Sequence, residues 1–229
     1  MLKIKTPLKK LSAAVALGLL ASTASASVTI YDTFKYGIDG HDMLFTGEWA
    51  AARFTVSPSE CPPAGCYMDS AILNLWSPDT DSDFKVTLEG VTLGVYSNNF
   101  SGGENHLPGN KLFDLIVPDH YVDSGALGTN VSFSAPGQVP AVLLQPHTAY
   151  WLKLTNESKD IDLGWAYNGA GHSGEYWAFQ QTGSPLAWGH GSPLIFEVTA
   201  VPIPGAIWLM GTAMIGLLAS GRRKLTRQA

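Results

Sequence analysis

Three aspartates at alternate positions, Asp79, Asp81 and Asp83, offer hard oxygen ligands in one short stretch. Carboxylates spaced in this way can converge on Ca²⁺. An EF-hand loop that began at Asp79 would need glycine at position 84 and glutamate at position 90, but Phe84 and Gly90 stand there. We interpret the stretch as an acidic turn between two strands. A Ca²⁺ site at the three aspartates is the alternative, and we expect no other cofactor.

Residues 171–175 read Gly-His-Ser-Gly-Glu and invite comparison with the nucleophile elbow of hydrolases. That motif needs glycine two residues after the serine, on a turn from a strand to a helix. Glu175 stands there and no helix follows, so we predict a loop. The six histidines are scattered singly, although His172 and His190 flank the last loops and could meet in space. We therefore expect no catalytic residues.

Six aromatic residues late in the chain form the most suggestive cluster for ligand binding. Flat rings on a sheet face or at a loop rim could stack against sugar rings. The rings at 165 and 167 have the same parity as apolar residues 161 and 163, so we expect that face to be buried. We expect Tyr176 and Trp188 to be exposed and take them as the candidate sugar contacts. The six residues are Trp165, Tyr167, Tyr176, Trp177, Phe179 and Trp188.

The elements that must position these residues are short β-strands. No helical periodicity of useful length appears between residues 27 and 200, where β-branched and aromatic runs alternate with Gly, Pro, Asn and Asp. This pattern predicts an all-β fold, a single antiparallel β-sandwich of jelly-roll type. The predicted strands are 49–56, 70–76, 84–88, 91–96, 111–117, 131–134, 139–144, 150–154, 161–167, 176–181 and 194–198.

In two of these predicted strands, 84–88 and 91–96, apolar residues alternate with others on either side of a Glu-Gly turn. This pattern predicts a β-hairpin. Phe84, Val86 and Leu88 would then face the core. The polar, Gly-rich residues 97–110 that follow predict a loop.

Cys61 and Cys66 flank a Pro-Pro-Ala-Gly segment. In a secreted chain this spacing predicts a small local disulfide that pins a loop. A metal site would need a second Cys or His pair at ligand spacing, and a redox pair would need C-x-x-C.

The N-terminus has the form of a secretory signal peptide. Four lysines lie among the first ten residues, and an apolar segment follows at 11–21. Ala24-Ser25-Ala26 is a small-residue cleavage site. We predict that residues 1–26 form a signal helix that is removed, rather than a retained N-terminal helix.

The chain between its two ends is strongly acidic. Six of the 14 Lys and Arg but all 19 Asp and Glu lie between residues 27 and 200, which gives this part a net charge of −13. Nucleic acids and anionic lipids are bound by basic patches, so we exclude both as partners of the body.

The tail carries an uncharged apolar run at residues 206–219, which ends before Arg222, Arg223 and Lys224. A full span needs about 20 apolar residues, so this run would cross a thin bilayer or stay in the membrane transiently. The basic cluster places the C-terminus in the cytoplasm. An ordinary C-terminal anchor is one interpretation. A lipid-anchor signal would end in hydrophobic residues, whereas this chain ends in a basic cluster.

The tail also resembles a known sorting signal. Val201-Pro202-Ile203-Pro204, the Gly- and Ala-rich run with Trp-Leu, and Gly-Arg-Arg-Lys are similar to a PEP-CTERM signal of the Val-Pro-Leu-Pro-Ala subtype. The resemblance implies a Gram-negative surface or matrix protein that passes through the inner membrane and is cleaved near the Pro motif by an exosortase-type transpeptidase. Ile203 and Gly205 depart from the usual residues, which leaves the cleaved bond open. The predicted parts are the signal peptide 1–26, the β-domain 27–200 and the sorting signal 201–229.

The β-domain resembles the choice-of-anchor R domain, which occurs with several kinds of anchoring tail. That resemblance implies a fold and a location, and the family has no catalytic or ligand residues to carry over. The matching pieces are 52–55, 91–96 with the Gly/Asn loop and Pro-Gly at 108–109, 150–152, Trp165 and Trp-Gly at 188–189.

These observations predict an exported, non-enzymatic protein of the cell surface or extracellular matrix, with a structural or adhesive role and contact with extracellular polysaccharide. The alternative is a secreted carbohydrate-binding module or carbohydrate-active enzyme. A carboxylate pair in a cleft would favour the enzyme, and an aromatic strip exposed on a sheet would favour the binding module.

Overall fold

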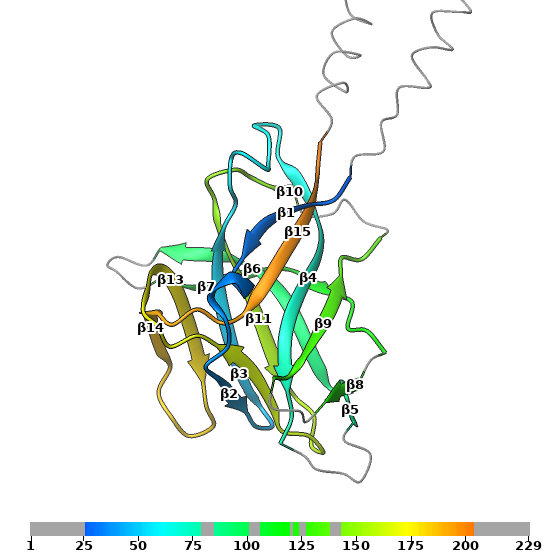
Figure 1. The fold of residues 1–229 in the computed structure, drawn as a ribbon, viewed down its shortest axis with the longest axis vertical. Helices are drawn as coiled ribbons and strands as arrows, with labels where there is room; N and C mark the ends of the chain where they lie inside the picture. The colour runs from blue at the N-terminus through cyan, green and yellow to red at the C-terminus, as the bar shows by residue number, and fades with distance from the viewer. Residues whose placement is uncertain are drawn as a thin grey trace, which may run out of the picture. The chain divides into compact units, whose positions relative to one another are not determined.

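The fold is built from antiparallel β-strands, as the alternating sequence pattern predicts. The computed structural model describes residues 26–78, 85–100, 106–119, 121–123, 127–137 and 143–203. Within these residues the structure contains strands β1 to β15 and one short 3₁₀-helix, η1 (Phe34–Tyr36), and the paired strands of each sheet run antiparallel (Figure 1). The prediction of an all-β fold is confirmed.

The first sheet has seven strands arranged around β4 (Cys66–Trp76), an 11-residue strand. Four strands pair with β4. β15 and β12 are its neighbours in the linear order of the sheet, and β9 and β10 pair with it outside that order. The order is β1-β15-β4-β12-β2. The bounds of the other strands are β1 Val28–Asp32, β2 Gly40–Leu44, β9 Thr129–Ser134, β10 Leu143–Leu144, β12 Leu163–Tyr167 and β15 Phe196–Pro202.

The second sheet has six strands in the order β14-β13-β3-β11-β6-β7. Strands β5 (Lys85–Thr87) and β8 (Tyr121–Asp123) form a separate two-stranded sheet. The bounds of the six strands are β3 Glu48–Thr55, β6 Val91–Phe100, β7 His106–Leu115, β11 Ala149–Asn156, β13 His172–Gln180 and β14 Ala187–Gly191.

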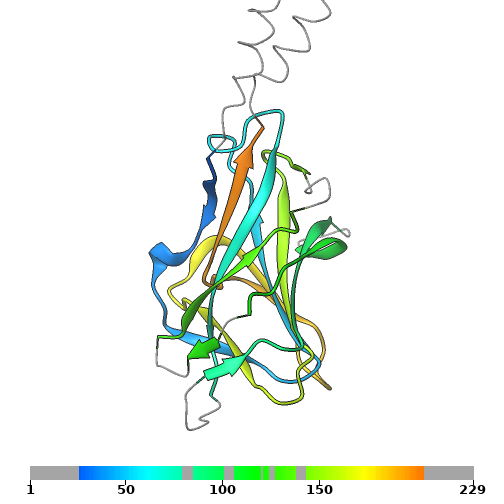
Figure 2. The same cartoon turned by 90° about the vertical axis from the view of Figure 1, so that its right-hand side faces the viewer.

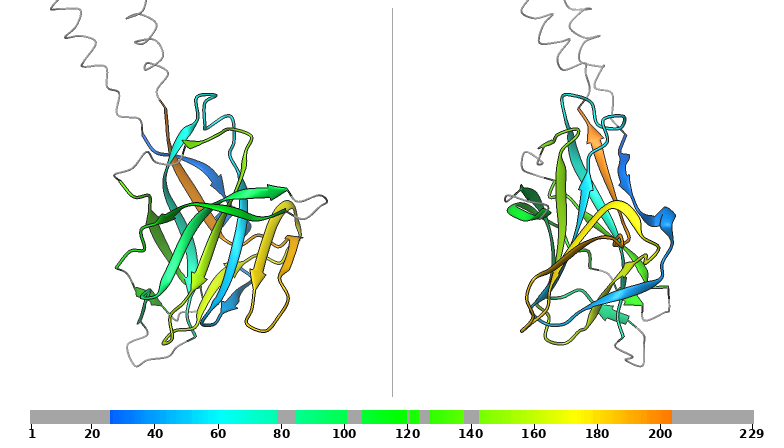
Figure 3. Two further views of the ribbon diagram at one scale, coloured as in Figure 1. Left: turned by 180° about the vertical axis from the view of Figure 1, so that it is seen from behind. Right: turned by 90° about the vertical axis from the view of Figure 1, so that its left-hand side faces the viewer.

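The two large sheets pack face to face and enclose the main hydrophobic core (Figures 2 and 3). Phe54 and Leu152 of the six-stranded sheet and Leu73 and Phe196 of the seven-stranded sheet are all buried in it. Period-2 alternation explains this arrangement, because every second residue of a strand points to the same face. The architecture is β-sandwich-like.

Two local predictions for residues 84–110 are wrong. Strand β5 pairs with β8, while β6 pairs with β11 and β7, so segments 84–88 and 91–96 do not form a hairpin with each other. The turn itself is present, since the Val91 amide donates to the Leu88 carbonyl at 3.1 Å and Gly90 has a φ of 79°. Val86 and Leu88 are buried as predicted, and Phe84 lies outside the described residues.

The second error concerns residues 97–110. Instead of a loop, the chain continues as strand to Phe100 and resumes as strand at His106. Strands β6 and β7 therefore form a long hairpin, whose residues take part in the site described below.

The first and last strands lie side by side. Val28 is opposite Ala200 in the antiparallel pair of β1 and β15, and residues Ser27–Pro202 form one compact unit. In the described part of the chain, no helix is long and apolar enough to cross a membrane. The predicted signal helix (residues 1–26, apart from Ala26) and the predicted membrane run at 206–219 lie outside the described residues.

Candidate functional site

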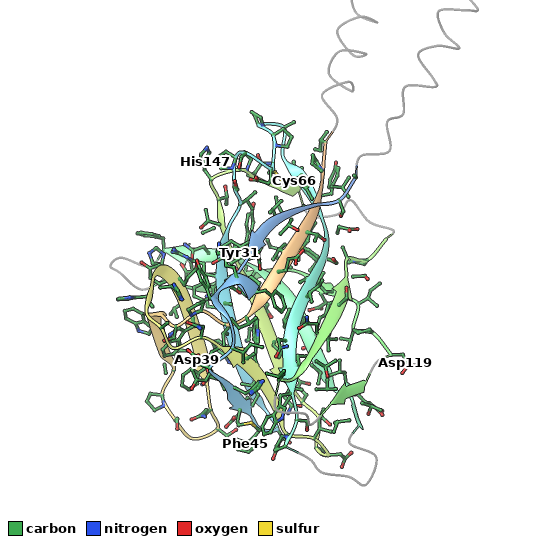
Figure 4. All side chains as sticks on the ribbon, in the orientation of Figure 1. Tyr31, Asp39, Phe45, Cys66, Asp119 and His147 are labelled. Atoms are coloured by element: carbon green, nitrogen blue, oxygen red, sulfur yellow. A yellow bond between two sulfur atoms is a disulfide. The ribbon has the colours of Figure 1, made fainter. Side chains whose placement is uncertain are left out.

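The two cysteines lie at one end of the domain, where β4 begins (Figure 4). Their sulfurs are bonded in a disulfide that closes the segment before β4, and both side chains are fully buried. The predicted disulfide is confirmed. Pro202 is opposite Cys66, and Val201 is opposite Tyr67. The first two residues of the predicted sorting motif are therefore part of β15, beyond the predicted domain boundary at residue 200.

The remaining sorting and processing residues are described only in part. Ile203 and Ala26 are described, whereas Ala24, Pro204, Arg222, Arg223 and Lys224 lie outside the described residues. Asp79, Asp81 and Asp83 also lie outside them. Among the residues that the structure places, no three His, Cys, Asp or Glu side chains come together in a way that could hold a metal ion.

The prediction of a loop at 171–175 is wrong for residues 172–175, which begin strand β13 (His172–Gln180). The His172 ring stacks on Tyr36 at 3.8 Å between centroids, and its Nε2 lies 3.1 Å from Asn168 Oδ1. His190 instead lies beside Tyr176, with the ring centroids 6.1 Å apart. The two histidines thus have different neighbours.

Four of the six late aromatic rings face the main core, including Trp165 and Tyr167, whose shared parity predicts it. Trp165 is fully buried and its Nε1 donates to the Ile195 carbonyl at 2.9 Å. Trp177 and Phe179 stack on each other at 5.2 Å and pack against the main core, and Tyr167 packs there too. The side chains of Tyr176 and Trp188 lie on the opposite side of the six-stranded sheet. Trp188 is 38% exposed, whereas Tyr176 is half-buried against neighbours that the sequence did not indicate.

Those neighbours lie on the side of the six-stranded sheet that faces away from the main core. We call this surface the outer face. It has its own small cluster of buried residues, separate from the core between the sheets. The outer face comprises Trp49, Ala51, Arg53, Tyr96, Trp151, Lys153, Tyr176, Ala178 and Trp188.

One row of side chains crosses the outer face from β14 to β6. Tyr176 of β13 is opposite His190 of β14. Trp151 of β11 is opposite Arg53 of β3 on one side and Tyr96 of β6 on the other. Residues opposite each other in neighbouring strands have Cβ atoms about 5 Å apart, so these side chains are in contact range.

The adjacent row contains small residues. Ala178 of β13 is opposite Trp188 and Ala51, and Lys153 of β11 is opposite Ala51 and Gly94. A Cβ on Gly94 would lie only 2.9 Å from the Tyr96 ring, so glycine is what allows that ring to lie over β6. The small residues leave room for the rings of the neighbouring row.

Two cations lie directly on aromatic rings of the outer face. The Arg53 guanidinium carbon is 3.8 Å from the centroid of Tyr176, and the Lys153 Nζ is 4.2 Å from the centroid of Trp49 and 5.6 Å from that of Tyr96. These distances are within the range of cation–π attraction. Both cations are half-buried, so the rings hold their charges at the protein surface rather than in bulk water.

The hairpin of β6 and β7 covers part of the outer face. Figure 3 shows it crossing the back of the sheet toward β13, and β7 contacts β13 although β3, β11 and β6 lie between them in the sheet. Trp151 is fully buried beneath it and donates from Nε1 to Asn98 Oδ1 at 2.8 Å. The His106 ring contacts Tyr176 and Phe100, each at 4.7 Å between centroids. Phe100 itself is 70% exposed.

Burial and neighbouring charges shift the pKa values of the basic side chains on and beside this surface. Burial lowers the pKa of Lys153, and the charge of Lys111 lowers it further. Burial and the charge of Arg53 together lower the pKa of His106 below its usual value of 6.5, so this imidazole is neutral at pH 7. Lys111 is paired with Asp114 at 2.9 Å, and this hydrogen bond raises the pKa of Lys111. Lys111 thus repels the Lys153 ammonium slightly.

An open depression of about 410 Å³ lies elsewhere, between the turn before β6 and the segment after β7. Its lining includes the carboxylates of Glu89 and Asp119 beside Leu88 and Pro118. It is separate from the outer face.

Comparison of the chain with protein-family models, with curated proteins and with solved structures finds no match. The assignment of a function therefore depends on the geometry of the sites themselves.

Sequence reasoning named two residues of the outer face and missed the others. The missed residues did carry a signal: in 49–53, Trp and Arg share a parity among three alanines, and in 151–155, Trp, Lys and Thr alternate with Leu. Such alternation predicts two different faces for each strand. What the alternation could not show is that β3, β11 and β13 are neighbours, which brings the separate residues onto one surface.

Proposed function

We propose that this protein is an exported, non-enzymatic protein of the cell surface or extracellular matrix that makes adhesive contacts with polysaccharide through its outer face. In this proposal, the signal peptide 1–26 directs export and is cleaved after Ala26. The tail, with Val201, Pro202, Ile203 and Pro204, inserts in the inner membrane and is processed by an exosortase-type transpeptidase. The body is a sandwich of jelly-roll type.

The observation that carries this proposal is the partly exposed aromatic surface on the outer face. Trp49, Tyr96, Tyr176 and Trp188 come from four different strands and lie on one side of one sheet. Rings with an apolar face and a polar edge suit the alternating apolar and hydroxyl-bearing faces of sugar rings. A buried disulfide in a short loop supports the extracellular location, since disulfides persist in oxidising compartments.

Two measurements test the proposal. The intact mass of protein recovered from the surface fraction should end near Pro204 if the tail is processed, whereas a mass that includes Lys224 indicates a retained membrane anchor. Binding of the full chain to a polysaccharide array should be weakened by Trp188→Ala. Absence of binding to every polysaccharide would reject the adhesive role.

A secreted carbohydrate-active enzyme is the second candidate, favoured by one carboxyl group. Glu175 is half-buried, and desolvation raises its pKa to about 7, a property of general acids in glycosidases. The test is release of reducing ends from polysaccharides by the full chain. Release that Glu175→Gln abolishes would support the enzyme, and no release from any polymer bound on the array would exclude it.

A further inference from the structure

The hairpin of β6 and β7 is joined to the sheet beneath it by two successive side-chain contacts. Trp151 of β11, which is fully buried, donates from Nε1 to Asn98 Oδ1 at 2.8 Å. Asn98 lies in β6, and its Nδ2 is 3.4 Å from Nδ1 of His106, the first residue of β7. A single amide group thus connects the buried indole to a histidine on the other strand of the hairpin.

The chemistry of the first contact fixes the protonation state that the second requires. An indole Nε1 is only a donor, so the oxygen of the Asn98 amide faces Trp151 and the NH₂ group faces His106. The Asn98 NH₂ group can donate to the His106 ring only if Nδ1 has no proton. The hydrogen bond therefore selects the neutral ring with its single proton on Nε2.

A second proton on this ring would break the connection. An imidazolium carries a proton on both nitrogens, so the Nδ1 proton would point at the NH₂ group of Asn98 and two donors would face each other. The ring cannot turn away without cost, because it contacts Tyr176 and Phe100, each at 4.7 Å between centroids. The charged form of His106 must lose either the hydrogen bond or these ring contacts.

The groups on the neighbouring strands also disfavour a positive charge at His106. Arg53 of β3 lies on the Tyr176 ring that His106 contacts, and its charge acts together with burial to lower the pKa of His106. His190 of β14, a second titratable group, lies beside the same ring with the centroids 6.1 Å apart. The contacts around Tyr176 therefore stabilise the closed hairpin best when His106 is neutral.

The other charged groups on these strands act elsewhere. In the described part of the chain, Glu175 of β13 accepts a hydrogen bond from Tyr31, and Asp114 of β7 is paired with Lys111. Lys153 of β11 adds a cation to the outer face. Neither of the two carboxylates is thus placed to hold a charged His106 ring.

We propose that the hairpin of β6 and β7 is a pH-sensitive cover of the outer face, which is closed while His106 is neutral and loosens when His106 takes up a proton. Opening uncovers Trp151, Ala51 and Ala178, which are fully buried in the closed state. An acidic medium therefore exposes more apolar surface on this side of the sheet. The inference goes beyond the proposed function and does not depend on what the outer face binds.

The direction of the effect follows from proton binding. The pKa of His106 lies below 6.5 in the closed hairpin and returns to its ordinary value when the hairpin opens. The open form therefore binds the proton more readily. Closure is fully favoured above pH 6.5 and is lost progressively as the pH falls through the lower pKa of the closed form.

Hydrogen exchange of the full chain in detergent tests the proposal. Between about pH 7.5 and about pH 5, protection factors corrected for the intrinsic effect of pH should fall at least about threefold at the amides of 97–100 and 106–110. Protection in β4 should not fall. The indole proton of Trp151, assigned by its absence in Trp151→Phe, should also exchange faster at the lower pH.

Four variants locate the group that responds to pH. His106→Gln keeps an acceptor that cannot take up a proton, so the hairpin should be equally protected at both pH values. His106→Phe keeps the ring contacts without the acceptor or the charge, and should be looser to the same degree at both. His190→Gln is the matched control, a histidine removed from the same face, and should keep the full pH effect. Glu175→Gln should keep it too.

Several results would overturn the proposal. One is equal protection of the wild-type hairpin at both pH values, and another is a pH effect that persists in His106→Gln. Equal loss of protection in β4 would show general unfolding rather than opening of the cover. Nitrogen NMR gives an independent result, because a neutral His106 ring with its proton on Nδ1 would contradict the hydrogen bond from Asn98.

Discussion

Glu175 connects the two sheets through a single side-chain contact. It accepts a hydrogen bond from the hydroxyl of Tyr31, which lies on β1 of the opposite sheet (Figure 4). The Tyr31 ring stacks on Phe196 at 5.1 Å and packs against the main core. A carboxyl group next to this apolar surface is poorly solvated when charged, which explains why its pKa rises to about 7.

Stability should therefore depend on pH between about 4.5 and 7 through Glu175. In this interval the folded protein keeps the proton while the unfolded chain has lost it, so stability is greatest at the acidic end and falls as pH rises toward 7. Partial exposure limits the change to on the order of 1 kcal/mol. Glu175→Gln should flatten this part of the profile, as measured by chemical denaturation at stepped pH.

The matched control is Glu89→Gln, which removes an exposed carboxylate. This variant should keep the wild-type slope. If Glu175→Gln and Glu89→Gln had the same pH profile as the wild type, the group responsible for the slope would have to lie elsewhere.

At the scale of elements, a side-chain hydrogen bond from Trp151 to Asn98 is one of the contacts that hold the hairpin of β6 and β7 over the sheet. Trp151→Phe keeps an aromatic ring but removes the Nε1 donor to Asn98. We expect the free energy of unfolding to fall by about 2 kcal/mol, because the variant loses the hydrogen bond and also part of the packing of a fully buried ring. Hydrogen exchange should become faster at the amides of 97–100 and 106–110, because the hairpin opens more often, and stay unchanged in β4.

A double-mutant cycle provides the control for this prediction. Asn98→Ala removes the other partner of the bond, so the loss in Trp151→Phe/Asn98→Ala should be about 1 kcal/mol smaller than the sum of the two single losses. Fully additive losses would show that the two residues act independently and that the hairpin is held by other contacts.

The alternation of residue types along each strand was enough to predict the fold class and much of its core. Trp165 and Leu163, for example, are both fully buried, as their shared parity predicts. The pairing of strands could not be predicted in the same way. The clean alternation of 84–88 and 91–96 around a Glu-Gly turn favours a local hairpin, but β8 supplies the partner of β5 from a distant part of the chain. Long-range pairing depends on the whole sheet rather than on one turn.

Prediction of the candidate site had the same limit, because it too depends on which strands are neighbours. Tyr176 could be chosen from the sequence because it alternates with Trp177 and Phe179, which share the other face of the same strand. Asn98 and His106 could not, since the polar segment 97–110 resembles a loop and its strands are identified only by their pairing across the hairpin. Arg53 could be assigned to the outer face only from the pairing of β3 with β13, which the sequence does not show.

At the scale of the whole molecule, the disulfide fixes the end of the domain where β15 leaves the sheet. Cys61→Ser/Cys66→Ser should lower the free energy of unfolding by about 2 kcal/mol, because the short closed loop restricts the unfolded chain. Urea denaturation measures this loss. The wild type in excess reductant should match the variant, and equal stability with and without the bond would contradict the expectation.

The antiparallel placement of β15 between β1 and β4 has a mechanical consequence. A pull on the chain beyond Pro202 acts along β15, perpendicular to the ladder hydrogen bonds with both neighbours, in a register that places Val28 opposite Ala200 and Cys66 opposite Pro202. Those bonds then share the load in shear and cannot be opened one after another like a zipper. A domain tethered through its C-terminal end would thus resist drag from a flowing medium with the combined strength of two strand interfaces.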